Sequence, residues 1–183
     1  MKPFFKSQFI VLLFSVLFLF SCSSDLDFNQ TKNVRLEPTY VANLVYFDIP
    51  ASEFVTNGIE TPQFMDRSTV DIFNNTFFVN DLVKVDLDFE INNTIARAYI
   101  LDVKLFNSSG IQLDTISIAV PAYSGAANVI TQKEIFQGTR LTTLKNTTRI
   151  EMALRMASGT ALTESSTGTI KMRSGVTAYF VIQ

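Results

Sequence analysis

The sequence predicts an all-β protein, folded as an antiparallel two-sheet β-sandwich of about seven to nine strands. From Glu37 onward, apolar residues alternate with polar ones at a period of two, as they do in half-buried strands. Short alternating segments are separated by turn-forming residues, and no segment has the pattern of a long helix. The exception is segment 138–146, where Leu141 and Leu144 lie three residues apart and predict one short helical turn.

Two segments show the strand pattern most clearly. In segment 83–91 apolar residues alternate with charged ones, and segment 149–156 repeats the pattern. Each is expected to bury one face and to expose the other. Leu87 and Leu154 are therefore predicted in the core. The carboxylates of segment 83–91, called the acidic stripe below, are predicted on a solvated face: Asp86, Asp88 and Glu90.

Turn residues such as Pro50, Pro62 and Pro121 bound the other strand candidates. These cover residues 41–49, 69–79, 97–106, 111–120, 127–135, 166–172 and 176–182. We expect the last two to form a hairpin with a three-residue loop at 173–175, because this register separates an apolar face from a polar one. Gly175 would then supply the left-handed residue that such a loop needs.

The arrangement of many short strands resembles an Ig-like or fibronectin-like β-sandwich. The resemblance is one of architecture, because the chain has no tryptophan and a single cysteine, and therefore lacks the cysteine and tryptophan core of antibody domains. It implies a fold and no particular function.

Cys22 is the only cysteine, and it follows a short apolar run at 9–20 that is preceded by Lys2 and Lys6. This layout is typical of a secretory signal, and the run is shorter than the roughly 18 residues that a spanning helix needs. Leu19 and Ser21, at minus three and minus one before Cys22, resemble the bacterial lipobox. That resemblance implies cleavage before Cys22 and its modification with acyl chains such as palmitate. The alternative is an uncleaved anchor helix in which Cys22 has no role.

The expected organisation is a lipoprotein signal peptide at 1–21, a lipidated cysteine with a flexible tether at 22–36, and a sandwich domain at 37–183. Within the tether, Ser24, Asp25 and Asp27 resemble the acidic surface-export signal of Bacteroidota lipoproteins, although Leu26 interrupts it. The alternative is a polar tether that is acidic by chance. The sequence thus predicts an outer-membrane lipoprotein, either on the cell surface or in the periplasmic leaflet.

Composition argues against an enzyme. The chain has no histidine, so it lacks the imidazole bases and metal ligands of many active sites. Its only thiol is expected to carry lipid, and neither Ser-x-x-Lys nor Gly-x-Ser-x-Gly occurs. We therefore expect no catalytic residue, no metal and no cofactor. The net charge of −2, without a basic run, also argues against nucleic acid as a partner.

The acidic stripe has two interpretations. It could bind calcium, which takes several oxygen ligands. It could instead form a solvated face whose carboxylates pair with lysines such as Lys84, Lys104 or Lys171. We favour the second, because alternate strand positions are too far apart to hold one ion.

Two further features allow a functional interpretation. Aromatic residues gather in the first third of the chain, where they either fill the core, which we favour, or stack on sugar rings: Tyr40, Tyr46, Phe47, Phe73, Phe77 and Phe78. Segment 114–116, Asp-Thr-Ile, resembles the O-glycosylation acceptor of Bacteroidota, with Thr115 as the acceptor. The alternative for Thr115 is an ordinary strand residue.

The sequence as a whole predicts a lipid-anchored cell-envelope protein that acts as a non-enzymatic accessory or scaffold subunit at the outer membrane. Its expected partners are the membrane, through Cys22, and envelope or outer-membrane proteins. The alternative is a surface module that binds glycans or other polymers. An exposed aromatic strip in a groove would favour the module, and an exposed apolar patch would favour a protein partner.

Overall fold

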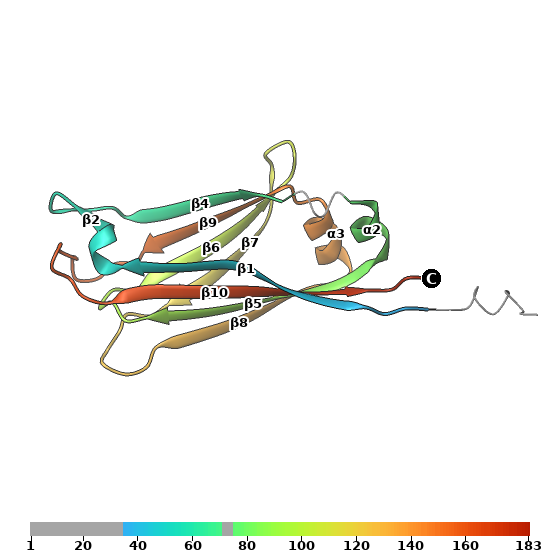
Figure 1. The fold of residues 1–183 in the computed structure, drawn as a ribbon. Coiled ribbons are helices and arrows are strands. Elements are labelled where there is room, and N and C mark those ends of the chain that lie inside the picture. Colours follow the sequence, from blue (N-terminus) through green and yellow to red (C-terminus); the bar gives the residue numbers. More distant parts are fainter. Residues whose placement is uncertain (1–34, 71–74) are drawn as a thin grey trace, which may run out of the picture. The chain divides into compact units, whose positions relative to one another are not determined.

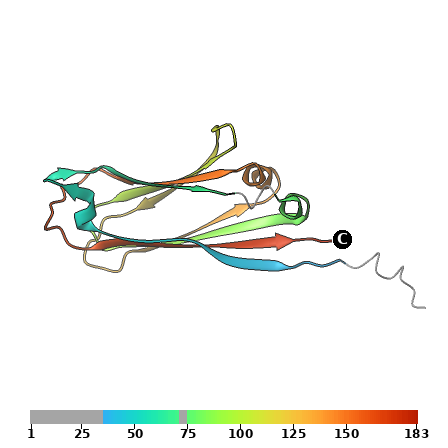
Figure 2. The same cartoon turned by 45° about the horizontal axis from the view of Figure 1, so that its top comes forward.

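A computed structural model of the chain describes residues 35–70 and 75–183. Within it, Arg35–Ile182 form one compact unit. Two four-stranded sheets pack face to face around the core (Figures 1 and 2). The predicted all-β, two-sheet antiparallel sandwich is confirmed.

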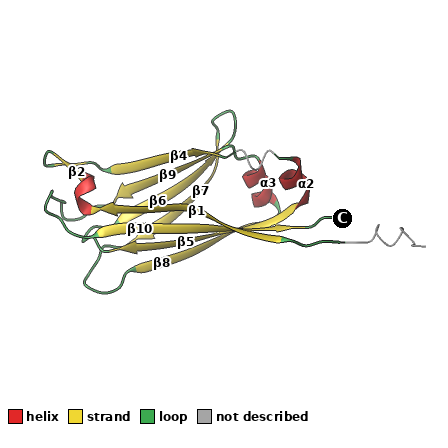
Figure 3. Cartoon of the chain, in the orientation of Figure 1, coloured by secondary structure: helices red, strands yellow, loops and turns green. Residues whose placement is uncertain are grey.

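The sheets are named here by their edge strands. The β1 sheet contains, in spatial order, β1 (Thr39–Pro50), β10 (Thr169–Phe180), β5 (Leu82–Asn93) and β8 (Val129–Phe136). The β4 sheet contains β4 (Gln63–Thr69), β9 (Arg149–Met156), β6 (Tyr99–Phe106) and β7 (Gln112–Val120). Shorter elements complete the fold (Figure 3): η2 (Ala51–Phe54), β2 (Val55–Thr56), β3 (Ile59–Glu60), α2 (Thr76–Asp81) and α3 (Thr139–Lys145).

The strand order is that of a jelly roll. The antiparallel pairs are nested along the chain, β1 with β10, β4 with β9, β5 with β8 and β6 with β7, and successive pairs alternate between the two sheets. In the Ig order the first strand pairs with the second, whereas here it pairs with the last. The two-sheet sandwich is therefore as expected, but the Ig-like order is wrong, because the strands are connected as in a jelly roll. Alternation within single strands does not specify the connections between them.

The core lies between the sheets, where their inward-facing side chains meet. Leu87 on β5 and Leu154 on β9 are both buried, as predicted. The predicted helical turn is also confirmed, because α3 buries Leu141 and Leu144 against the end of the sandwich. Both results follow from the spacing of apolar residues, at a period of two in the strands and at three residues in the turn.

The expected hairpin at 166–182 is wrong, because β10 is one continuous strand. Apolar side chains on both sides of Ser174 share one face of this strand, so no turn is needed to keep them together. Ser174 is a buried polar residue on that face. Its hydroxyl accepts a hydrogen bond from the Val45 amide at 3.1 Å and donates one to the Val45 carbonyl at 3.3 Å. These two bonds satisfy the hydrogen-bonding capacity of the buried Ser174 hydroxyl, at the point where β1 bulges between Asn43 and Tyr46.

The strand expected at 69–79 is also wrong. Strand β4 ends at Thr69, and α2 begins at Thr76 after Asn75, whose side chain accepts a hydrogen bond from the Phe77 amide at 2.9 Å. An asparagine cap of this kind favours a helix start over a strand. Phe73 lies outside the described residues.

Candidate functional site

The residues predicted to anchor and export the protein lie outside the described part of the chain: Cys22, Ser24, Asp25 and Asp27. The signal peptide expected at 1–21 lies there too, as does the tether up to Val34. Leu36, which was expected in the tether, forms a bridge with Ile182 through two backbone hydrogen bonds of 2.9 Å. Among the described helices, none is long and apolar enough to cross a membrane.

The acidic stripe lies on the outer face of the β1 sheet and is ion-paired, as favoured from the sequence. The ion pairs join Asp86 to Lys84 at 3.0 Å, Asp88 to Lys133 at 2.9 Å and Glu90 to Arg173 at 2.7 Å. Two of the three lysines proposed as partners lie elsewhere: Lys171 pairs with Asp48, and Lys104 lies opposite Glu151 in the β4 sheet. Residues 35–70 and 75–183 contain no group of three acidic, histidine or cysteine side chains arranged for a metal ion.

The solvated face expected for the stripe is wrong for Asp86, which is its most enclosed carboxylate, with 4% of its surface exposed. Burial alone would raise its pKa, but hydrogen bonds from Lys84 and Tyr179 and the nearby charge of Lys133 hold the pKa of Asp86 below its ordinary range. Asp86 is therefore a fixed anion that organises its neighbours and has no proton to exchange near neutral pH.

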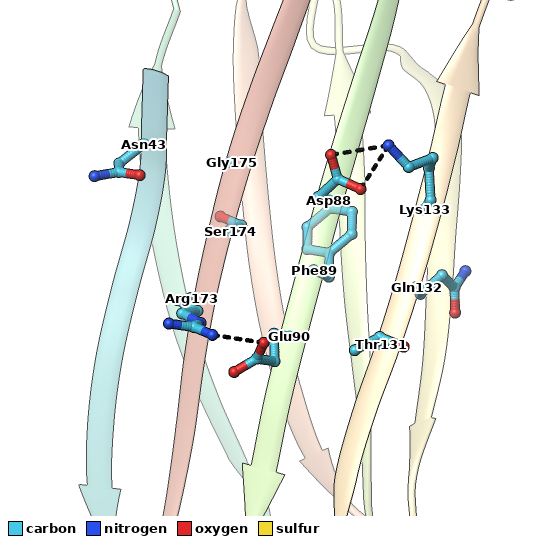
Figure 4. A pocket seen from close by; sticks show the side chains of 10 residues that line it. All are labelled: Asn43, Asp88, Phe89, Glu90, Thr131, Gln132, Lys133, Arg173, Ser174 and Gly175. Atoms are coloured by element: carbon cyan, nitrogen blue, oxygen red, sulfur yellow. Dashed lines mark hydrogen bonds and ion pairs between the residues drawn. The ribbon is translucent and has the colours of Figure 1, made fainter. Parts of the chain in front are cut away.

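A shallow hollow of about 720 Å³ lies beside the stripe on the same outer face (Figure 4). One row of paired residues crosses it from β1 to β8: Asn43, Gly175, Asp88 and Lys133. The next row contains Arg173, Glu90 and Thr131. Two ion pairs join the strands that form the hollow, and Figure 4 shows both as dashed lines, Asp88 with Lys133 and Arg173 with Glu90.

An apolar slot opens on another side of the sandwich, between the edge strands β1 and β4. Two adjoining hollows of about 210 and 170 Å³ share Val45, Asp66 and Met152 in their walls. Core side chains on β6 and β9, including Leu101 and Leu154, line the larger hollow. The residues that line the two hollows also include exposed apolar ones: Leu44, Tyr46, Phe64 and Met65. Core side chains thus form the floor of the slot at this open edge, although Leu101 and Leu154 are themselves only 1% and 3% exposed.

The expectation that the aromatic residues fill the core is wrong for three of them, Tyr40, Tyr46 and Phe77, the last of which is 36% exposed. Tyr40 and Tyr46 are 57% and 69% exposed, because they lie on an edge strand that has a neighbour on one side only. Phe47 and Phe78 pack partly against the core, and Phe77 stacks on Phe180 with ring centroids 4.8 Å apart.

Thr115, the candidate O-glycosylation residue, lies within β7 and is half-buried. Its hydroxyl accepts a hydrogen bond from the Gln112 side chain at 2.9 Å. Its amide donates a hydrogen bond to the Asp114 carboxylate at 2.8 Å. Glycosylation of Thr115 would therefore require its hydroxyl to lose the hydrogen bond from Gln112 first.

The sequence did not predict the slot or the hollow, although residues of both were named for other reasons: Tyr46, Phe47 and Leu154 of the slot and Gly175 of the hollow. Strand β4 was not predicted from the sequence, because its residues do not alternate cleanly between apolar and polar. Most of them are exposed in the structure. A weak signal was present in Phe64-Met65, two large apolar residues beside each other. Consecutive apolar residues on an edge strand place one side chain on each face.

Asp102 on β6 gives a prediction for acid stability. Burial alone would raise its pKa, but hydrogen bonds from Arg155 at 2.7 Å and Ser117 at 2.6 Å hold the pKa of Asp102 below its ordinary range. A depressed folded-state pKa stabilises the fold above the unfolded-state pKa of about 4, and this contribution is lost as the pH falls below that value. Asp102→Asn should therefore lower stability at neutral pH and weaken its decline in acid.

Urea unfolding at about pH 7 and about pH 3 measures this effect. The wild type should lose more stability between the two pH values than Asp102→Asn does. Asp66→Asn, at an exposed carboxylate, serves as the control and should follow the wild type. An Asp102→Asn variant whose pH dependence matches the wild type would contradict the assigned role.

Comparison with known proteins assigns no family. No protein-family profile matches the chain, and no curated protein matches its sequence. Similar solved structures include the VP2 subviral particle of infectious bursal disease virus, with 11% identity, a TM-score of 0.40, and 79% of this chain and 38% of that chain covered. Another is a protein of Parabacteroides distasonis ATCC 8503 described as secreted, with 12% identity, a TM-score of 0.42, and coverage of 63% and 36%.

A third is the enzymatically active domain of bacteriophage CBA120 tailspike protein 4, with 11% identity, a TM-score of 0.38, and coverage of 80% and 19%. The chain therefore spans less than two fifths of the length of each of these three proteins. Similarity at this level assigns no function to the chain.

Proposed function

We propose that this chain is a lipid-anchored envelope protein, held at the outer membrane by acyl chains on Cys22, that acts as a non-enzymatic accessory or scaffold subunit. Its sandwich binds an extended apolar segment of a partner protein at the open edge between β1 and β4. The apolar slot at that edge is the observation that carries this proposal.

Strand β1 has few of the features that normally protect an edge strand. Segment 39–47 carries no charged residue and no proline, and its bulge is its one protective feature. Val41 is 76% exposed and Tyr46 is 69% exposed. The other edge strands carry charges: Asp66 and Arg67 on β4, Lys133 and Glu134 on β8, and Asp114 on β7. Among the four edge strands, β1 is therefore the one to which an incoming strand would pair most readily.

An added strand can use both chemical features of this edge. The main chain of an edge strand offers unpaired N–H and C=O groups, which give affinity to strand addition. Alternate side chains of the incoming segment would enter the slot and cover Met152 and Leu154, which gives specificity for apolar residues. The segment would thus extend the β1 sheet and close the sandwich at the same time.

The anchoring part of the proposal rests on the sequence around Cys22, where a lipobox-like segment follows a short apolar run. Acyl chains contribute about 0.8 kcal/mol per buried CH₂ group, which is enough for stable anchoring when two or more chains are present. Ser24, Asp25 and Asp27 would direct the anchored protein to the cell surface. Without that signal the protein would remain in the periplasmic leaflet.

A single affinity purification with three variants tests the proposal. The tagged protein is cross-linked in cells and extracted from membranes, and co-purifying proteins and the mature N-terminus are identified by mass spectrometry. We expect a diacyl- or triacyl-cysteine at position 22. The Cys22→Ala variant should no longer be found in the membrane fraction. Leu44→Lys, which places a charge over the slot, should lose the partner.

Val129→Lys is the matched control, because Val129 is an exposed apolar residue, at 53%, on the opposite edge of the same sheet. It should retain the partner. A partner bound equally by wild type and Leu44→Lys would refute the edge as the binding site. An unmodified Cys22 in native material would refute the anchor.

A further inference from the structure

We propose that the hollow on the outer face of the β1 sheet binds a neutral polyhydroxylated ligand, an oligosaccharide, centred on Gly175. This site does not depend on the partner proposed for the slot, although Tyr46 borders both of them. The outer face of the β1 sheet forms the hollow, whereas the slot lies between the edge strands β1 and β4.

Gly175 is a glycine that the fold does not require. It lies inside a strand, and its φ lies outside the left-handed region. A Cβ atom added there would meet only the Ala42 carbonyl oxygen, at an ordinary distance of 3.6 Å. Glycine weakens the interior of a strand, and it commonly marks a bulge, a bend or the close approach of a ligand or another backbone. The bulge of β1 lies beside Gly175, but the space around an added Cβ atom shows that the bulge does not require glycine there. Gly175 leaves the floor of the hollow open.

The charges around the hollow suit a neutral ligand. The acidic stripe faces three cations, Lys84, Lys133 and Arg173, and each carboxylate is paired with one of them. The face therefore has no excess charge to attract an anionic or cationic polymer. The ion pairs also hold donors and acceptors in fixed places, which favours binding because less side-chain motion is lost.

The groups that remain match the hydroxyls of a sugar. Asn43 is exposed beside Gly175, and its amide both donates and accepts hydrogen bonds. Thr131 lies on the far side of Glu90 and adds a hydroxyl. These two residues and the ion pairs form a polar surface, called the polar bed below, in which donors and acceptors alternate. Such a surface is complementary to the hydroxyl groups around a pyranose ring.

An exposed aromatic side chain lies at the border of the hollow. Tyr46 is directly opposite Arg173, which lines the hollow, and 69% of its surface is exposed. The C–H face of a sugar ring is apolar and packs against an aromatic ring, while the hydroxyls turn to polar groups. Tyr46 thus supplies the apolar surface that the polar bed lacks, and it takes the place of tryptophan, which the chain does not contain.

Native affinity electrophoresis of the full, detergent-extracted protein tests the site. Gels contain β-glucan, mannan, xylan or dextran as neutral probes, and polygalacturonate as a charged comparator. We expect migration to be retarded by at least one neutral polysaccharide. Gly175→Leu should weaken that binding about tenfold or more, because the new side chain occupies the ligand's volume.

Tyr46→Ala is a second variant, which tests the site even if Gly175→Leu does not fold. Because Tyr46 is exposed, its replacement should leave the fold intact. It should also weaken binding. Ala119→Leu places the same leucine side chain at an exposed position of β7 in the other sheet and should bind like wild type. Retardation by no neutral polysaccharide, retardation by polygalacturonate alone, or wild-type binding by Tyr46→Ala would each overturn the proposal.

Discussion

Leu87→Ala is expected to lower the free energy of unfolding by about 2–5 kcal/mol, which is the range for deleting a buried leucine side chain. Leu87 is 5% exposed and belongs to the central strand β5, which has neighbours on both sides. The loss combines the transfer free energy of the removed atoms with the cavity that the rigid sheets cannot close. Leu154→Ala should fall near the lower end of the range, because Leu154 lines the slot and water can fill part of the space.

Urea unfolding followed by circular dichroism measures these differences. Asp88→Ala is the control, because it removes an adjacent side chain from the solvated face of the same strand. Asp88 is 48% exposed in its ion pair with Lys133, and exposed pairs contribute little, so the change should stay under about 0.5 kcal/mol. Equal losses at Leu87 and Asp88 would contradict the assignment of the two faces of β5.

Gly168→Ala is the second substitution with a large expected effect, a loss of about 2–5 kcal/mol from positive φ and overpacking together. Gly168 has a φ of +100°, and a Cβ atom added there would lie 2.3 Å from the Thr94 carbonyl oxygen. The obstacle is backbone, so a side-chain rotation cannot relieve it. Hydrogen bonds hold the neighbourhood in place, including Thr94 N to Thr169 O at 2.9 Å and Ala51 N to Gly168 O at 3.0 Å.

Gly175→Ala is the matched control for Gly168→Ala. The same methyl group at Gly175 meets no clash, and alanine is better than glycine inside a strand, so stability should rise by about 0.5–1 kcal/mol. Thermal unfolding of the two variants measures the opposite signs. A similar change in both would show that the backbone around Gly168 yields more easily than its hydrogen bonds indicate.

Much of the local structure follows from the sequence alone. The alternation in β5 and β9 identifies the buried faces, because side chains of a strand point to opposite sides in turn. The same reasoning finds α3 from Leu141 and Leu144. It also places the acidic stripe on the outer face, since Val85, Leu87, Phe89 and Ile91 are buried on the other face, but it does not foresee that the neighbours of Asp86 enclose it.

A local pattern that is compatible with two structures predicts the wrong one at 166–182. A hairpin at 173–175 and a continuous β10 both gather the same apolar residues on one face, and only the pairing of β10 with β1 and β5 along its whole length distinguishes them. Ser174 contributed to the error, because a buried serine looks like a turn residue until Val45 is seen to satisfy it.

The sequence by itself determined the fold class and the faces of the best-patterned strands, and the lipidation expected at Cys22 rests on the sequence alone. Only the tertiary structure decided the jelly-roll order, the partners of the acidic stripe, the exposure of Tyr46 and the places of the slot and the hollow. The physical reason is distance along the chain. Alternation arises from the geometry of neighbouring residues, whereas pairing such as Thr39 with Tyr179 depends on which distant strands bury each other's faces.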